Sequence, residues 1–88
     1  MKYHVVFSEE ARKNLKKMDK HQAKVILTWI QTHLEGCSNP YAFGKGLVQN
    51  LSGQWRYRVG DYRILTEIHQ NEVVILVLKI DHRRKVYE

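Results

Sequence analysis

The spacing of apolar residues changes halfway along the chain, from helical spacing to the alternation that is typical of β-strands. Near the start, Tyr3–Phe7 combines aromatic and β-branched residues, which predicts a first strand. Ser8 follows as a helix N-cap, and Glu9 and Glu10 place negative charge in the first turn. We therefore expect the chain to pass directly from a strand into a helix.

Two apolar stripes follow at helical spacing. Their members are Ala11, Leu15 and Met18 in the first, and Ala23, Ile26, Leu27, Ile30 and Leu34 in the second. Asp19 is expected to begin the second helix, with Gln22 completing a capping-box arrangement, and Gly36 is expected to end it. These features predict two antiparallel helices joined by a short turn.

The second half of the chain has the period of β-strands. The predicted strands are Leu47–Leu51, Trp55–Val59, Tyr62–Ile68, Val73–Ile80 and a terminal extension at Lys85–Tyr87. Gly60-Asp61 suits a two-residue hairpin turn, and Gln70-Asn71 suits a second tight connection. The apolar run that starts at Val73 has no polar face, so it is expected to form a central strand.

Together these elements predict one α+β domain over residues 1–88. An N-terminal strand and an antiparallel helical hairpin are expected to pack on a twisted, mainly antiparallel β-sheet. The length of 88 residues and the hydrophobic content of 43% suit a single modest core.

Composition adds an expectation about partners and compartment. The formal charge of +6 favours an anionic partner, either nucleic acid or an acidic protein. The single cysteine, Cys37, cannot form an internal disulfide, and no segment reads as a signal peptide or a membrane span. We therefore expect a cytoplasmic protein that does not bind membranes.

The arginines are concentrated in the predicted sheet. Five of the six lie in the last 36 residues, at Arg56, Arg58, Arg63, Arg83 and Arg84. The Gly60-Asp61 turn would place Arg58 directly opposite Arg63, which is destabilising unless an anion lies between them. Arg56 shares a face with Arg58, and a guanidinium binds phosphate through two parallel hydrogen bonds. The arginines therefore indicate RNA, with mere solubility of the sheet surface as the alternative.

Other candidate groups are fewer. His82 lies beside Arg83 and Arg84, whose charges favour its neutral, proton-accepting form. One cysteine and scattered histidines are poor material for zinc, and no phosphate loop or nucleophile elbow is present, so no metal or cofactor is expected. Three aromatic residues are candidates for stacking on bases, or for packing between the hairpin and the sheet: Tyr41, Phe43 and Trp55.

The segment from Trp55 to Leu65, the ending from Ile80 to Tyr87 and the predicted order of elements resemble the RelE branch of the RelE/ParE toxin superfamily. The resemblance covers essentially the whole chain, and its motifs are a Tyr-Arg-hydrophobic strand and a His-Arg-x-x-Val-Tyr ending. It implies a type II toxin that enters the ribosomal A site and cuts mRNA there. It also implies a protein antitoxin, through which the complex binds operator DNA.

The resemblance implies an RNA cleavage that needs no metal, in which the 2′-hydroxyl attacks the adjacent phosphate. Arg63 and Arg83 match family arginines that hold the phosphate and neutralise its developing charge. Tyr87 matches a tyrosine that stacks on or orients the nucleotide. These three residues, with His82, form the expected catalytic set.

Arg56 and Arg58 depart from the family pattern. They stand where a Lys-x-Lys pair is usual, and one of those lysines is implicated as the base. A guanidinium stays protonated, so the two arginines, with Arg84, are expected to bind RNA instead. The base is then His82, or catalysis rests on ribosomal positioning and charge stabilisation.

Two other functions stay open at the level of sequence. The ParE branch shares the fold but inhibits DNA gyrase, and such an inhibitor needs no set of arginines and a tyrosine on the sheet. A non-catalytic relative that binds RNA or protein is the third possibility.

Overall fold

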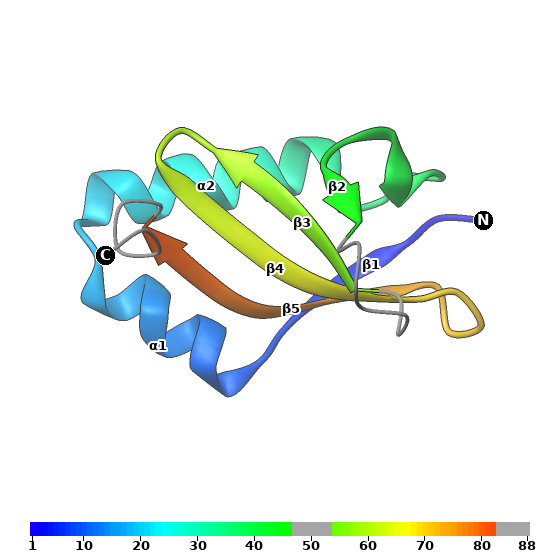
Figure 1. The fold of residues 1–88 in the computed structure, drawn as a ribbon, viewed down its shortest axis with the longest axis horizontal. Coiled ribbons are helices and arrows are strands. Elements are labelled where there is room, and N and C mark those ends of the chain that lie inside the picture. The colour runs from blue at the N-terminus through cyan, green and yellow to red at the C-terminus, as the bar shows by residue number, and fades with distance from the viewer. Residues whose placement is uncertain (47–53, 83–88) are drawn as a thin grey trace.

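The computed structural model describes residues 1–46 and 54–82, and within them two helices pack on a five-stranded sheet (Figure 1). The elements are β1 (His4–Phe7), α1 (Glu9–Lys17), α2 (Lys20–His33), a short 3-10 turn η1 (Pro40–Ala42), β2 (Lys45–Gly46), β3 (Gln54–Val59), β4 (Tyr62–His69) and β5 (Val74–His82). The strand order is β1-β5-β4-β3-β2, with β1 parallel to β5 and the other pairs antiparallel. The predicted α+β class is confirmed.

Some predictions fall outside the described residues. They are the strand at Leu47–Leu51, the terminal extension at Lys85–Tyr87, and the site residues Arg83, Arg84 and Tyr87. The site is therefore built below from the residues of β2 to β5.

The junction of β1 and α1 is fixed by a residue that serves both the helix and the sheet. Ser8 Oγ accepts a hydrogen bond from the Ala11 amide at 3.0 Å, which confirms the predicted N-cap. The same hydroxyl donates to the Leu78 carbonyl at 2.8 Å. Further along α1, Asn14 Oδ1 accepts from the Ile80 amide at 2.9 Å. Since β1 pairs only with the first part of β5, these α1 groups satisfy the edge of β5 beyond it.

Helix α2 supplies the apolar layer beneath the sheet. Asp19 caps it by accepting from the amides of His21 and Gln22, as predicted. Ile26 and Ile30 are buried, but Leu27 is 41% exposed, so the predicted stripe is wrong at that position.

In the described part of the chain, neither helix is long and apolar enough to cross a membrane.

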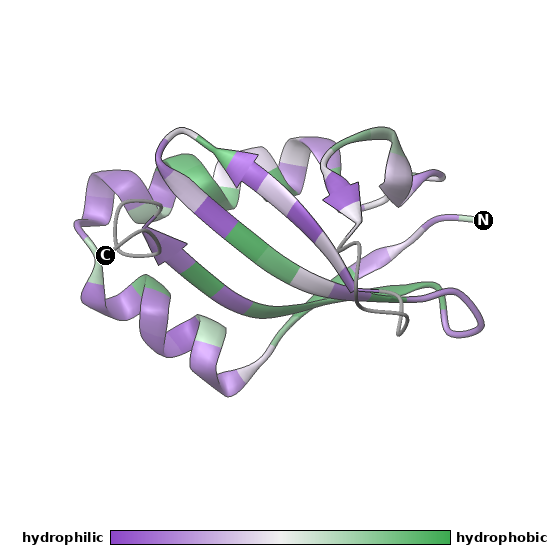
Figure 2. Cartoon of the chain, in the orientation of Figure 1, coloured by the Kyte–Doolittle hydropathy of each residue, from purple (hydrophilic) through white to green (hydrophobic). Residues whose placement is uncertain are grey.

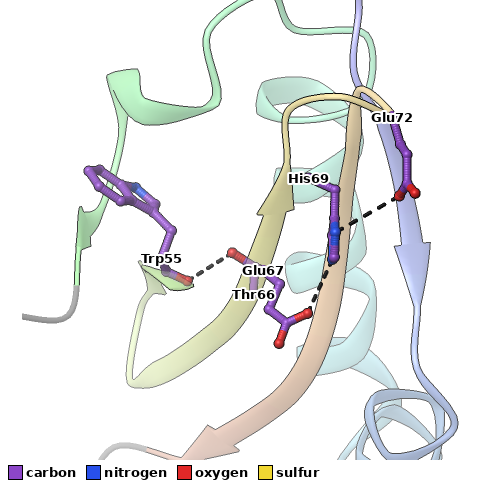
Figure 3. A network of polar contacts seen from close by, with 5 residues as sticks. All are labelled: Trp55, Thr66, Glu67, His69 and Glu72. Carbon is purple, nitrogen blue, oxygen red and sulfur yellow. Dashed lines mark hydrogen bonds and ion pairs between the residues drawn. The ribbon is translucent and has the colours of Figure 1, made fainter. Parts of the chain in front are cut away.

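The core lies between the helices and one face of the sheet. Along β3 and β4 the buried positions alternate with more exposed ones. Figure 2 shows that hydrophobic and hydrophilic residues both occur along these strands. The fully buried side chains are mainly apolar: Tyr57, Ile26, Leu34, Ile64, Ile75, Val77, Thr66 and Pro40. Thr66 is the polar member, and its Oγ1 donates to the Trp55 carbonyl at 2.8 Å (Figure 3).

The two hairpin turns differ in how well the sequence predicts them. Gly60 has a φ of 58°, a left-handed value that glycine adopts without strain, and the Gly60-Asp61 turn has the predicted two residues. The second connection is longer than expected, because His69 pairs with Val74. Val73, predicted as the first strand residue, lies in that connection with a φ of 56°. For a β-branched residue this value is strained.

A β-bulge interrupts the pairing of β4 with β5. Leu65 pairs with Lys79, but its neighbour Thr66 pairs with Val77, so Leu78 is an extra residue on β5. The alternation of side chains along β5 therefore shifts by one residue at Leu78. This shift decides which residues of the second half of β5 reach each face of the sheet.

Candidate functional site

Both helices lie on one side of the sheet, and the opposite side is here called the open face (Figure 1). By the register of the strands, charged side chains gather on the open face. The register places them in two rows across the strands. One row is Arg58, Arg63 and Asp81; the other is Lys45, Arg56, Leu65 and Lys79. Neighbours within a row are about 5 Å apart, and positions two apart along a strand are about 7 Å apart. Among the described residues, the rows hold five cations and one anion.

The predicted like-charge pair is present, and Lys45 lies opposite Arg56 in the same way. Arg58 stands directly opposite Arg63, with Arg58 exposed and Arg63 half-buried. Arg56 lies two residues before Arg58 and therefore shares its face. Like charges in directly opposed positions destabilise a sheet, and a bound anion would relieve that repulsion. The structure thus brings three predicted RNA-site arginines to one surface.

The other predicted catalytic residue in the described range, His82, lies on the helix side of the sheet. It pairs in register with Tyr62, and the two rings meet edge to face with centroids 5.0 Å apart. Both line a cavity of about 300 Å³ together with Asn14 and Lys17 of α1. Because Tyr62 and Arg63 are adjacent on β4, they point to opposite faces. The described structure therefore does not bring His82 together with the arginine rows, and its role as the base stays a prediction.

Two of the three aromatic candidates for base stacking are used in packing near β2. Trp55 Nε1 donates to the Phe43 carbonyl at 2.5 Å, and the Trp55 ring meets Tyr41 edge to face at 4.9 Å. Phe43 remains 42% exposed, although its ring contacts Trp29 and His33 of α2. These contacts favour the packing interpretation for Trp55 and Tyr41.

A buried tyrosine hydroxyl holds the segment before β2 in place. Tyr57 is fully buried, and its hydroxyl donates to the Pro40 carbonyl at 2.6 Å. Burial raises the pKa of Tyr57 far above its ordinary value, with smaller contributions from Cys37 and Tyr41. Tyr57 therefore acts as a neutral structural donor that fixes the turn before β2.

The opposite end of the open face carries negative charge. His69 Nε2 lies 3.1 Å from a carboxylate oxygen of Glu67, and its Nδ1 lies 3.9 Å from Glu72 (Figure 3). The open face is thus basic at the end near Gly60 and acidic at the end near Glu72. Such a gradient orients a polyanion toward the arginine rows.

Three residues of the open face were not anticipated: Lys45, Lys79 and Asp81. Lys79 Nζ and Asp81 Oδ2 form an ion pair of 3.4 Å. Simple alternation from the buried Val77 would point both residues toward the core, and only the bulge at Leu78 turns them outward. The one sequence signal was a lysine within an otherwise apolar strand.

In residues 1–46 and 54–82, no group of His, Cys, Asp or Glu could hold a metal ion.

A second candidate surface is a groove of about 610 Å³ between the two helices. Its apolar lining includes Leu15, Met18, Ala23 and Leu27, and its lysines are Lys16, Lys20 and Lys24. The exposure of Leu27, unexpected for a core stripe, is explained by its place in this groove. An apolar floor with a basic rim suits an amphipathic acidic helix.

Comparison with known proteins shows which family the chain belongs to. The model of the family described as the ParE toxin of the type II toxin–antitoxin system parDE matches residues 5–87. Toxin RelG of Mycobacterium tuberculosis is 30% identical over 87 residues, which cover 99% of this chain and 98% of that protein.

Solved structures give the same result. A chain of the RelBE2 toxin–antitoxin complex of Mycobacterium tuberculosis superposes with a TM-score of 0.82 at 29% identity, covering 94% of this chain and 100% of that one. A chain of the archaeal RelE–RelB complex of Pyrococcus horikoshii superposes with a TM-score of 0.71 at 25% identity, covering 94% and 97%. The chain therefore belongs to the RelE/ParE superfamily, whose members are toxins of type II toxin–antitoxin systems.

Proposed function

We propose that this toxin is a metal-independent endoribonuclease that cuts mRNA in the ribosomal A site and so inhibits translation. The observation that carries the proposal is the opposed pair Arg58 and Arg63, flanked on the same face by Arg56. Three guanidinium groups on two neighbouring strands offer several two-point hydrogen-bond donors for phosphate on one surface. RelE-type relatives add support from similarity.

The chemistry assigned to this surface is an internal transfer of the phosphate. The 2′-oxygen attacks the neighbouring phosphorus as its proton leaves, the bond to the 5′-oxygen breaks, and that oxygen takes up a proton. The product ends are a 2′,3′-cyclic phosphate and a 5′-hydroxyl. Arg63 neutralises the charge that builds on the phosphate oxygens, and no metal or cofactor takes part. Arg83 and Tyr87 are proposed to complete the site, with Arg84 as a further RNA contact.

The proton of the 2′-hydroxyl must be removed as its oxygen attacks the phosphorus. His82 is the candidate base, and its ring lies beside Tyr62 at the end of β5. From there it would have to reach the reacting sugar around the end of the sheet. If it does not, positioning of the RNA by the ribosome and the arginine charges carry the reaction.

A second candidate function is inhibition of DNA gyrase, because the matching family model is named for ParE. A gyrase inhibitor has no need for opposed arginines on a sheet. The basic open face therefore favours the ribonuclease. The two functions are distinguished by whether protein synthesis or DNA synthesis falls first when growth stops.

An antitoxin is the proposed protein partner. Two similar structures are complexes of RelE-type toxins with RelB-type antitoxins. In this chain the groove between α1 and α2 is apolar and bears three lysines, so we propose that it receives an acidic amphipathic helix of the antitoxin. Operator DNA would be bound through the antitoxin.

Primer-extension mapping of mRNA in cells that express the chain without an antitoxin tests the function. We expect position-specific cuts within translated regions, with protein synthesis falling before DNA synthesis. The Arg63→Ala variant should lose the cuts, and Lys13→Ala, an exposed change on α1, should keep them. Intact mRNA, together with an early fall in DNA synthesis, would reject the ribonuclease in favour of gyrase.

Kinetics on programmed ribosomes separate catalysis from docking. Arg63→Ala and Arg83→Ala should each lower the cleavage rate by about a hundredfold or more, while ribosome binding is largely kept. Arg63→Lys should restore only part of the rate, because an ammonium cannot form the two parallel hydrogen bonds. Equal losses in affinity and rate would show that the arginines are docking groups.

A further inference from the structure

One carboxylate stands among the cations of the open face. Asp81 lies directly across from Arg63 in the register and 3.4 Å from the ammonium of Lys79. A surface built only to attract RNA would gain nothing from a negative charge at this position, since the carboxylate repels phosphate. The position of Asp81 therefore calls for a specific explanation.

Stability explains Asp81 only in part. Its place across from Arg63 is an opposite-charge cross-strand position, which contributes about 0.2–1 kcal/mol, and its ion pair with Lys79 adds little more. Both partners of the ion pair are exposed, with 46% of the Lys79 side chain and 39% of the Asp81 side chain accessible. Exposed pairs of this kind contribute about 0–1 kcal/mol. The bulge at Leu78, moreover, turns both residues to the open face, where the arginine rows lie.

We propose that Asp81 is a specificity-determining residue of the RNA surface, an inference that rests on the ribonuclease function proposed above. In the free protein its carboxylate holds the Lys79 ammonium. When RNA binds, Asp81 keeps phosphate away from the β5 end of the rows. The phosphate that reacts is thereby confined to the arginines of β3 and β4.

The geometry sets the range of this effect. Asp81 is one strand away from Arg63 and two strands away from Arg58, or about 5 and 10 Å in backbone terms. A phosphate centred over β3 and β4 lies near the limit of screening at physiological salt, whereas a phosphate over β5 would contact the carboxylate. Asp81 therefore penalises a shift of the RNA toward β5 more than it penalises the productive position.

The test is equilibrium binding of a short, labelled single-stranded RNA at several salt concentrations. Asp81→Asn should bind the RNA about two- to fivefold more tightly than the unmodified chain, because Lys79 becomes available to phosphate. The slope of log affinity against log salt should steepen by about 0.7, the value for one added phosphate contact on a single strand. Loss of a merely structural group would weaken binding instead.

Matched variants make the result specific. Glu10→Gln removes the same charge from the exposed first turn of α1, on the helix side of the sheet, and should leave the salt slope unchanged. Asp81→Glu should restore ordinary affinity. In Asp81→Asn combined with Lys79→Gln, the gain should disappear, as a double-mutant cycle requires when two residues are coupled.

Each outcome decides a separate point. If Arg58→Ala weakens RNA binding but Asp81→Asn binds like the unmodified chain or more weakly, the inference about Asp81 fails and the RNA surface stands. A gain that persists in the double variant also overturns it, since Lys79 would not be the released group. If neither Arg56→Ala nor Arg58→Ala changes the RNA affinity, the proposed function fails, and the role of Asp81 fails with it.

Discussion

Arg58 and Arg63 occupy positions that a sheet built for stability alone would fill with other residues. The two guanidinium groups repel each other, and threonine in place of the exposed Arg58 would favour the strand more. Ser8 and Glu35, by contrast, make contacts that hold the framework together. At the scale of single residues, the chain thus separates side chains that bind its proposed ligand from side chains that secure the fold.

Replacing Arg58 should therefore separate stability from RNA binding. Arg58→Thr is expected to raise the free energy of unfolding by roughly 0.2–1 kcal/mol, because it removes a like-charge pair and adds a β-branched residue. RNA affinity should fall in the same variant. Urea denaturation measures the first effect, and Arg58→Lys, which keeps the charge, is the control. A destabilised Arg58→Thr would mean that the arginine has a structural role.

Glu35 should make the fold sensitive to acid. Its carboxylate accepts from the Val5 amide at 2.9 Å and lies 3.0 Å from His4 Nδ1, and these contacts, the Val5 hydrogen bond first, lower the pKa of Glu35. A carboxylate whose pKa is lowered by folding stabilises the protein at pH values above its unfolded pKa, which is about 4.3 for glutamate. This contribution is lost as the pH falls through the lowered pKa of the folded state. Glu35→Gln should show a smaller loss of stability on acidification below about pH 4.3. Equal pH profiles in urea titrations would contradict this role.

At the scale of elements, the sequence predicts local features well and registers between strands only in part. Caps at Ser8 and Asp19 and the Gly60-Asp61 turn are short-range signals, and all three are confirmed. The longer turn that contains Val73 was missed, because strand propensity says nothing about a positive φ.

The candidate site shows the same division. The register of β3 with β4 follows from a two-residue turn, so the shared face of the arginines was predictable. The bulge at Leu78 depends on pairing between distant strands and leaves no local mark in the sequence. Lys79 and Asp81 were therefore missed, and His82 could not be assigned to the helix side.

The junction between β1, α1 and β5 offers a test at this scale. Ser8→Ala removes the cap of α1 and a hydrogen bond to the Leu78 carbonyl, so it should cost about 1–2 kcal/mol. Asp19→Ala removes a cap whose bonds are exposed, and it should cost less. Urea denaturation of both variants gives the comparison. A larger loss for Asp19→Ala would show that the tie to β5 contributes little.

For the whole molecule, the parallel pairing of β1 with β5 joins the two ends of the fold. His4 to Phe7 pair with Val74 to Val77, about seventy residues further along the chain. Every other strand pair is a neighbour in sequence among the described strands. The described sheet therefore includes one long-range strand pair, whose formation costs more loop-closure entropy than the hairpin pairs do.

Removing the first strand should therefore unfold the whole protein and not leave a shorter folded domain. A chain lacking residues 1–7 loses the partner of β5 and the buried Tyr3, and we expect its circular dichroism to lack a cooperative thermal transition. Val6→Thr, an exposed change within the same strand, should keep the transition. A cooperative transition in the shortened chain would show that β3 to β5 and the helices are sufficient for folding.

The same topology sets when the sheet can be completed during synthesis of the chain. The ribosome makes β1 first and β5 last, so a nascent chain that stops before Val74 has neither the partner of β1 nor the strand that lies across from Arg63. Such a fragment already has the hairpin of β3 and β4 with Arg58 and Arg63, but it lacks the strand that joins this hairpin to β1. The complete sheet, and with it any surface that needs a rigid sheet, can therefore form only after β5 has been made.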